Sequence, residues 1–466
     1  TLDTNKPADE QLNEIFDKVG AAKAKLDEIE ATATTAVQNE KERKAAYGLR
    51  LPKASVTGAY IYMGDDMAID MNDLKAPVGG VLEGLGNLPN IPPAILQQAS
   101  SLLAKDWSMK LQDRSFANVG ANITLPLYTG GKINAANNAA KIKIEEVAEK
   151  GNQTRGSLVS ELTERYYGLV LALQVVEVRR QVLEGMQHHL SDAKALEANG
   201  IIAKGERLYA EVHTAEAERE LLKAQKTVET LYSALSNTLG GDESTYIPAT
   251  SMFILSDIEN VSYFKDLAKQ HSPLLKQVGY KKQLATENMR LQRADFAPQV
   301  ALTGMAAFYN YQVSPIIPKW AVGAGVSLKI FDGLNREYKF SAAKSQIRQV
   351  EAVGHQAESD ILTLIDKLYN EMVTYSQQLP SVNASGRFAE EYLRIKEEAF
   401  KEGAAPSSDV VDARLNLAKI RIERLQAAYY YDMMLARLLE ACGQSELFPD
   451  YGKRAAAMPI RYEHDF

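Results

Sequence analysis

The residues best placed to carry chemistry in this chain are two carboxylates near its C-terminal end. Asp409 and Asp412 are three positions apart, so a helix presents both side chains on one face. Carboxylates arranged this way attract cations where several copies of a chain meet around one axis. A second interpretation stays open, because Pro406, Ser407 and Ser408 supply helix-cap chemistry and acidic residues in a first turn favour the helix dipole.

Patterns for catalysis or metal binding do not stand out. The six histidines form no HExxH set, and the adjacent His188 and His189 would point about 100° apart on a helix. No Ser-His-Asp or Gly-x-Ser-x-Gly arrangement stands out. The run from Tyr128 to Lys132 is not a phosphate loop, because Pro126 stands where the upstream glycine belongs. We therefore expect no enzyme, no cofactor and no bound metal.

Charge and cysteine content narrow the class of protein further. The net charge of −7 argues against nucleic acid as the main partner. Cys442 is the single cysteine, which excludes a disulfide framework within the chain, and its helical surroundings predict a small apolar role. The chain opens at Thr1 without a starting Met or an export signal, which is typical of a processed or trimmed chain. Its ends neither show nor exclude export.

The sequence contains itself twice at a constant offset. Val119-Gly120-Ala121 returns as Val322-Gly323-Ala324, Gly200 returns as Gly403, and Gly240 returns as Gly443, so each pair differs by 203. Insertions collect in loops and would break such a register, so its survival over about 120 residues predicts two copies of one long, mostly loop-free unit.

Each copy begins with short stretches in which apolar residues alternate with small or polar ones. This is strand periodicity, and none of the stretches contains a charged residue. Prolines and glycines interrupt them too often for a membrane helix, whereas a membrane strand needs only about 9 to 11 residues. Half-buried strands of a water-soluble sandwich alternate in the same way, so that alternative stays open at this point. The expected strands are Ala54 to Gly64, Ser115 to Gly131, Gln299 to Tyr309 and Trp320 to Leu328.

Very long helices are expected to follow the strands. No proline occurs from Asn134 to Ala198, and only Pro380 occurs between Arg336 and Glu402, so each helix would be about 100 Å long. A narrow apolar stripe runs along both, as in coiled-coil seams. Each helix should end near Gly200 or Gly403 and be followed by a returning helix. Two further helical stretches, Ala8 to Tyr47 and Ser256 to Arg293, precede the first strand of each copy, and Ser272-Pro273 should start a new helix inside the second stretch.

The first copy carries extra residues between its two strands, from Asp65 to Asp106. The acids Asp65, Asp66, Asp70 and Asp73 make calcium binding conceivable, but they lack the spacing and the glycine of an EF-hand. We therefore expect a long, solvated external loop.

Five short motifs stand along the chain: Leu51-Pro52, Leu127-Tyr128-Thr129-Gly130-Gly131, Ala297-Pro298, Ile330-Phe331-Asp332-Gly333-Leu334, and Gly403 followed by Asp409-Val410-Val411-Asp412-Ala413. In this order they resemble the TolC family of bacterial outer-membrane efflux proteins, and the resemblance covers about Gln11 to Gly443. The resemblance implies a mainly α fold with membrane β structure, in which three copies close a 12-stranded β-barrel that a long α-helical barrel continues. It also implies a passive exit duct for drugs, toxins or other substrates, located in the outer membrane with a periplasmic extension. The implied partners are two further copies, outer-membrane lipid, a periplasmic adaptor and an inner-membrane pump of a tripartite efflux or type I secretion system.

The resemblance also implies roles for residues at the turns. Asp409 and Asp412 would line the narrow periplasmic mouth as a gate, with Glu206 as the equivalent acid of the first copy and Tyr209 in place of the second. The family's basic latch residue would fall on Ala405, which puts that latch in doubt. An adaptor would dock at the hairpin tips, although a turn that merely reverses the chain would look the same. The tip residues are Gly200, Ile201, Ile202, Gly403 and Ala404.

The expected organisation follows the repeat. The main alternative is a soluble helical coiled-coil scaffold or a periplasmic adaptor, which would explain the long stripes but not four charge-free strands. The expected segments are an N-terminal periplasmic helix (1–50), a first β-hairpin of the barrel (51–131, with the loop at 65–106), a helical hairpin (132–240), an equatorial segment (241–255), the helices that open the second copy (256–296), a second β-hairpin (297–333), a second helical hairpin (334–443) and an equatorial tail (444–466).

Overall fold

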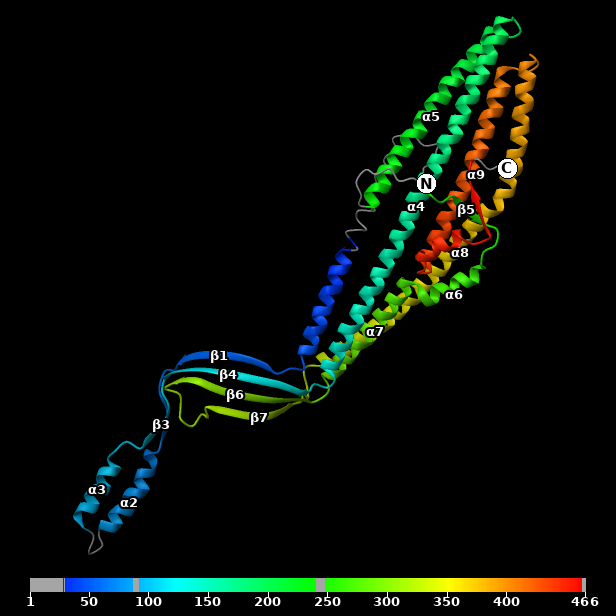
Figure 1. Cartoon of the computed structure of the whole chain (residues 1–466). Coiled ribbons are helices and arrows are strands. Elements are labelled where there is room, and N and C mark those ends of the chain that lie inside the picture. Colours follow the sequence, from blue (N-terminus) through cyan, green and yellow to red (C-terminus); the bar gives the residue numbers. More distant parts are fainter. Residues whose placement is uncertain (1–27, 29, 87–91, 240–247, 463–466) are drawn as a thin grey trace. The chain divides into compact units, whose positions relative to one another are not determined.

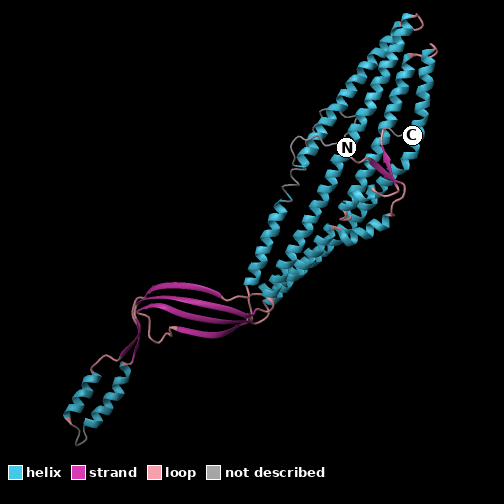
Figure 2. Ribbon diagram, in the orientation of Figure 1, coloured by secondary structure: helices cyan, strands magenta, loops and turns pink. Residues whose placement is uncertain are grey.

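A computed structural model describes residues 28, 30–86, 92–239 and 248–462. The chain divides into two units. We call residues 41–140 and 286–344 the sheet unit, and residues 1–40, 141–285 and 345–466 the helical unit. The sheet unit holds the expected strands, and the helical unit holds most of the long helices (Figure 2).

Four antiparallel strands form the main sheet of the sheet unit. They are β1 (Lys53–Tyr62), β4 (Ser115–Tyr128), β6 (Gln299–Tyr311) and β7 (Trp320–Ser327). Their order is β1-β4-β6-β7, which leaves β1 and β7 as the edges (Figure 1). All four lie where the alternating, charge-free stretches predicted strands, so that prediction is confirmed.

The two faces of this sheet differ in chemistry. Register pairing places Trp320 beside Ala306, Ala306 beside Ala121, and Ala121 beside Val56 on one face. Large side chains of that face are open, and Val56, Trp320 and Val322 are 70%, 70% and 74% exposed. The opposite face carries hydrogen bonds between polar side chains, from Asn122 to Thr57 (3.1 Å) and from Asn118 to Asn310 (2.6 Å). One face is therefore apolar and the other polar.

The connection between β1 and β4 is not the expected loop. It contains a ribbon of β2 (Met67–Asp70) and β3 (Ser108–Gln112), the 3₁₀ helix η1 (Asn72–Leu74), and the helices α2 (Lys75–Gly86) and α3 (Pro93–Leu103). Two of the acidic residues that suggested calcium binding form contacts at the ribbon instead. Asp66 pairs with Lys110 (2.9 Å), and Asp70 accepts a hydrogen bond from the backbone amide of Asn72 (2.8 Å). The loop prediction was wrong because it followed the acids and prolines and overlooked apolar residues at helical spacing.

The long helices of the two copies correspond in length and in position within the repeat. Helix α4 (Lys132–Ala198) and helix α8 (Asn335–Lys401) have 67 residues each and start 203 positions apart. The returning helices α5 (Lys204–Leu239) and α9 (Ser407–Ala441) also start 203 positions apart. We call α4–α5 the first helical hairpin and α8–α9 the second. The repeat prediction is confirmed, although Gly240 itself lies outside the described residues.

Shorter helices complete the predicted helical set. Helix α6 (Val261–His271) ends at Ser272, and α7 (Pro273–Ala294) begins at the next residue, as the Ser-Pro pair predicted. A helix covers residues 30–48, and the earlier part of the helix expected from Ala8 lies outside the described residues. Among the residues that the structure describes, no helix combines the length and the hydropathy needed to cross a membrane.

The core of the helical unit is built around α9. This helix buries residues along its whole length, including Leu425, Tyr431 and Leu435. The equatorial segment (241–255) and the equatorial tail (444–466) each contribute a strand, and these strands pair as β5 (Met252–Leu255) and β8 (Ala457–Ile460). Every residue of β5 is buried. The tail also contains η2 (Ser445–Leu447) and α10 (Phe448–Gly452). Cys442 is buried here, and burial raises the pKa of its thiol to about 12, which fits the predicted apolar role.

Candidate functional site at the hairpin tips

The two helical hairpins reverse direction through the same backbone motif. Gly200 has a φ of 70° and Gly403 a φ of 74°. The amide of Ile201 donates to the Leu196 carbonyl (2.9 Å), and the amide of Ala404 donates to the Ala399 carbonyl (2.8 Å). This is the Schellman ending, which glycine permits because it adopts positive φ without strain.

The tips are joined by an apolar cluster to which all four long helices contribute. Ala193 of α4, Ala210 of α5, Phe400 of α8 and Val410 of α9 are each at most 1% exposed. Ile202 packs against this cluster. At Gly403, a side-chain carbon would lie 2.9 Å from Cγ2 of Ile201, so the turn of the second hairpin touches the turn of the first. The adaptor-docking residues predicted from the sequence are thus brought together.

Ser407 is the point where polar groups of the two hairpins converge. It is fully buried at the start of α9. Its backbone N–H donates to the Glu206 carboxylate (2.6 Å), and its hydroxyl lies 2.6 Å from Nε2 of His189. A helix N-terminus attracts negative charge. The first turn of α9 is therefore capped by Glu206 from the other hairpin. The residue at the cap position itself, Pro406, forms no side-chain cap bond.

His189 is held in an apolar setting. Its ring lies 4.4 Å from the ring of Phe400, measured between centroids. Burial and, to a smaller extent, the nearby Arg414 guanidinium lower the pKa of His189 to about 4, while Asp192 acts in the opposite direction. The imidazole is therefore neutral near pH 7 and can exchange one hydrogen bond with the Ser407 hydroxyl.

The two predicted gate acids occupy different environments. Asp409 pairs with Lys396 of α8 (2.6 Å between Oδ2 and Nζ), and this hydrogen bond raises the pKa of Lys396. Asp412 is exposed. Burial and the charge of Asp412 raise the pKa of Tyr209, which places this carboxylate near the residue that replaces it in the first copy. Asp412 is thus the acid of the pair that is open to solvent.

A partly buried arginine forms contacts across the same region. Arg414 of α9 forms an ion pair with Glu397 of α8 and lies over Gly185 of α4, where an added Cβ would overlap its guanidinium. Desolvation lowers the pKa of Arg414, and Glu397 acts in the opposite direction. Arg207 of α5 pairs with Glu197 of α4 (2.6 Å). Each hairpin therefore has its own ion pair between helices.

Sequence reasoning found some of these residues and missed others. Glu206 and Asp409 were singled out, and both make contacts at the tips. His189 was considered only as a metal ligand and Ser407 only as a cap, while Lys396 and Arg414 were not considered. His189 lies buried on a helix and faces Phe400. No sequence pattern around His189 distinguishes it from any other core residue.

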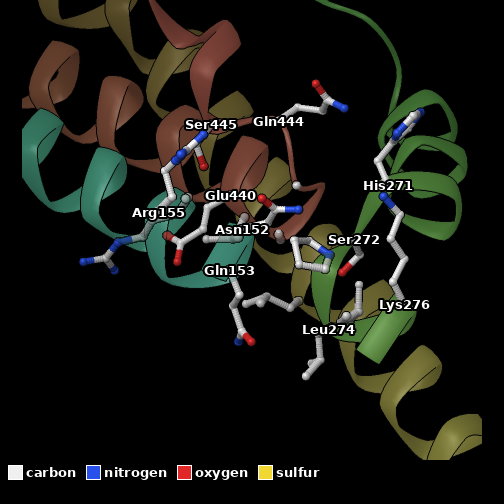
Figure 3. Close-up of a pocket in the computed structure, with 18 of the residues that line it drawn as sticks. Asn152, Gln153, Arg155, His271, Ser272, Leu274, Lys276, Glu440, Gln444 and Ser445 are labelled. Carbon is white, nitrogen blue, oxygen red and sulfur yellow. The ribbon is translucent and has the colours of Figure 1, made fainter. Parts of the chain in front are cut away.

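The helical unit also contains a cavity away from the tips. Its volume is ≈ 660 Å³, and it lies where α6 meets α7, beside α4 and the end of α9 (Figure 3). Charged residues of its wall pair with one another, Lys276 with Glu149 (3.8 Å) and Arg155 with Glu446 (3.7 Å). The wall therefore carries no concentration of one charge that would select a ligand.

Comparison with known proteins identifies relatives of the whole repeat. The sequence model of the outer membrane efflux protein family matches residues 96–241 and 265–444. Protein CyaE of Bordetella pertussis is 24% identical over 286 residues, and the alignment spans 59% of this chain and 59% of CyaE.

Solved structures show the same fold. The outer membrane protein VceC of Vibrio cholerae matches with a TM-score of 0.68 at 16% identity, covering 93% of this chain and 96% of VceC. The open state of the MtrE outer membrane channel of Neisseria gonorrhoeae matches with a TM-score of 0.63 at 16% identity, covering 93% of this chain and 89% of MtrE.

Proposed function

Because the chain belongs to the outer membrane efflux protein family, we propose that it is the outer-membrane channel of a tripartite efflux or type I secretion system. In this role it is a passive duct that carries drugs, toxins or other substrates to the exterior and hydrolyses nothing. The family match covers both repeats, which speaks against the soluble scaffold or adaptor.

The open edges of the main sheet carry this proposal. The sheet has one apolar face and ends at β1 and β7. In lipid, unpaired amides of an open edge have no water to bond, so membrane sheets close into barrels. Three copies of a four-stranded sheet give twelve strands, in which β1 of one copy pairs with β7 of the next. The polar face, with its asparagine pairs, then lines the channel.

The hairpin tips are proposed as the entrance. Asp412 and Asp409 supply negative charge at the mouth, and Glu206 holds the two hairpins of one chain together through Ser407. The paired turns at Gly200 to Ile202 and Gly403 to Ala404 offer the surface on which a periplasmic adaptor docks, and the adaptor links the duct to an inner-membrane pump.

The experiment is purification in detergent followed by light scattering and planar-bilayer recording. We expect a trimer that forms conducting channels. A monomer that stays soluble without detergent and never conducts would refute the proposal and favour the scaffold. A matched pair tests the two faces of β7: Val322→Lys should prevent insertion, at about 2 to 4 kcal/mol per buried charge, whereas Gly323→Lys should be tolerated.

A further inference from the structure

The hairpin of α2 and α3 carries an apolar surface that the main sheet does not use. The two helices lie side by side beyond the β2–β3 ribbon (Figure 1). Leu74, Val78, Val81 and Leu85 follow one another at i, i+4, i+7 and i+11, and they are 53%, 45%, 63% and 41% exposed. We call these four residues the outer stripe. Exposed apolar surface of this extent on an ordered element marks a binding surface.

Packing between α2 and α3 leaves the outer stripe free. The contact between the two helices uses another face of α2, where a carbon added at Gly79 would lie 4.0 Å from Cδ1 of Leu103. Leu82 and Leu103 are half-buried there, in contrast to the outer stripe. On an α-helix, residues at 100° steps place Gly79 and Leu82 about 100° away from the outer stripe. The outer stripe is thus a second apolar face.

Charge and spacing favour a helix over a lipid surface as the occupant. Lys75 and Glu83 are the only charged residues within α2 and α3. Helices that lie on membranes carry several basic residues on their polar face, and these helices do not. The i, i+4, i+7, i+11 spacing is that of a coiled-coil seam, which seats another helix. Glu83 lies on the far side of α2 from Val81, so like charges would not meet if identical stripes came together.

Hydrogen bonds anchor the base of the hairpin and the ribbon that carries it. Asn72 donates to Asp106 (2.7 Å) and accepts the amide of Trp107 (3.0 Å) at the base of the helices. Gln112 donates to the carbonyl of Gln312 (2.5 Å) and accepts the amide of Ser314 (2.7 Å), which ties the ribbon to the β6–β7 connection. The ribbon follows directly on β1, the edge strand that the proposed trimer pairs with a neighbouring copy.

We propose that the occupant of the outer stripe is the same stripe of neighbouring copies, so that three hairpins join as a six-helix cap at the outer mouth of the channel. The proposal rests on the trimer proposed above and adds to it a second closure, at the end of the barrel opposite the helices. Each hairpin contributes an uncharged seam, and the anchored ribbon sets its distance from the axis.

Cysteine crosslinking of the full chain tests the cap. In a Cys442→Ala background, Val81→Cys should give a disulfide-linked dimer after oxidation of the detergent-purified trimer. The control Glu83→Cys lies on the same helix, is also exposed and faces away from the stripe, so it should stay monomeric on denaturing gels. A trimer in which Val81→Cys fails to crosslink, or in which both variants crosslink equally, overturns the cap and leaves the proposed channel standing. Loss of the trimer itself refutes the channel proposal as well.

A second measurement separates protein from lipid as the occupant. A fluorophore attached at Val81→Cys in proteoliposomes should not be quenched by lipids that carry brominated acyl chains. Quenching there would overturn the cap in favour of membrane contact. Val81→Asp, which places three like charges on the seam, should raise the single-channel conductance above that of the unmodified chain and of Glu83→Gln. An unchanged conductance in Val81→Asp overturns the role of the cap in closure.

Discussion

Ser407 concentrates the contacts that join the two hairpins of one chain. Its amide is capped by Glu206 and its hydroxyl meets His189, so α9 is tied to both helices of the first hairpin through one buried residue. A carboxylate at a helix N-terminus satisfies an otherwise unpaired amide and complements the helix dipole. Any opening of the proposed mouth that separates the hairpins must break these two hydrogen bonds.

The neutral state of His189 makes this junction sensitive to acid. Burial lowers the pKa of His189 to about 4, whereas an unfolded histidine titrates near 6.5. Between these values the unfolded chain binds more protons, so the contribution is complete above about pH 6.5 and is lost as the pH falls toward about 4. The loss amounts to about 3 kcal/mol. We predict a falling thermal unfolding midpoint over this range.

The control for the acid effect is His189→Gln, whose side chain can still bond Ser407 but does not titrate. The difference in unfolding midpoint between the two proteins should shrink as the pH falls from 7 to 4. Equal pH dependence in both proteins would assign the effect to other groups.

The open carboxylate of Asp412 should control cation block at the mouth. Replacing Asp412 with Asn removes one exposed charge from each copy, so the proposed trimer loses three. We expect block by Mg²⁺ to weaken roughly a hundredfold, because each nearby carboxylate contributes about 1 kcal/mol to binding a divalent ion in water. Asp409→Asn should have a smaller effect, since Lys396 already neutralises Asp409. Single-channel currents at increasing Mg²⁺ measure both. If Asp409→Asn weakened Mg²⁺ block more than Asp412→Asn, Asp409 and not Asp412 would be the acid of the pair that is open to solvent.

At the level of elements, the two turns look alike but differ in their surroundings. Gly200 and Gly403 both have positive φ, so alanine costs about 1 to 2 kcal/mol of backbone strain at either position. Only at Gly403 does the added carbon approach Ile201, at 2.9 Å, whereas nothing lies within 4 Å at Gly200. We predict that Gly403→Ala increases hydrogen exchange at both tips and that Gly200→Ala increases it only at its own.

Ile201 provides the check on this explanation. Combining Gly403→Ala with Ile201→Ala removes the close approach, so exchange in the first hairpin should return toward that of the unmodified chain. If the double variant exchanges as fast as Gly403→Ala alone, contact between the turns is not the cause.

The long elements were predictable from sequence because their signals are local. Alternation predicted the strands, and the glycines predicted the turns. Helix α4 was predicted from the absence of proline, and α8 from a stretch that only Pro380 interrupts. The contacts at the hairpin tips were not predictable from sequence, because Glu206 and Ser407 lie 201 positions apart and no spacing rule relates them. The helices α2 and α3 were missed for another reason: the acids and prolines around them resemble a loop, while the i, i+4 spacing of their apolar residues is short and weak.

At the scale of the molecule, the repeat explains how a small unit can build a duct. Two similar hairpins in each chain give six similar helical hairpins around the axis of the proposed trimer. The copies differ where function is proposed: Glu206 and Tyr209 in the first copy correspond to Asp409 and Asp412 in the second, and the α2–α3 hairpin is inserted in the first copy alone. Departures from the repeat therefore mark both ends of the proposed channel.

The proposed closure between copies depends on the free edge of β1. The amide of Met63 donates to Arg114 (2.7 Å) on the β4 side of the ladder. Hydrogen-bonded pairs alternate in antiparallel sheets, so the amides of Val56 and Tyr60 point to the open edge. Proline lacks an amide hydrogen and is tolerated on edge strands. Val56→Pro should therefore preserve the sheet of one chain and remove a bond between chains.

We predict that Val56→Pro yields a folded protein with unchanged helical circular dichroism and a dissociated trimer in detergent. Thr57→Pro is the matched control, because its amide faces β4, and it should disrupt the sheet within the chain instead. Light scattering and protease resistance of the strands distinguish the two. A stable Val56→Pro trimer would mean that the copies do not join through β1, because a proline at that position cannot donate the bond that closes the barrel.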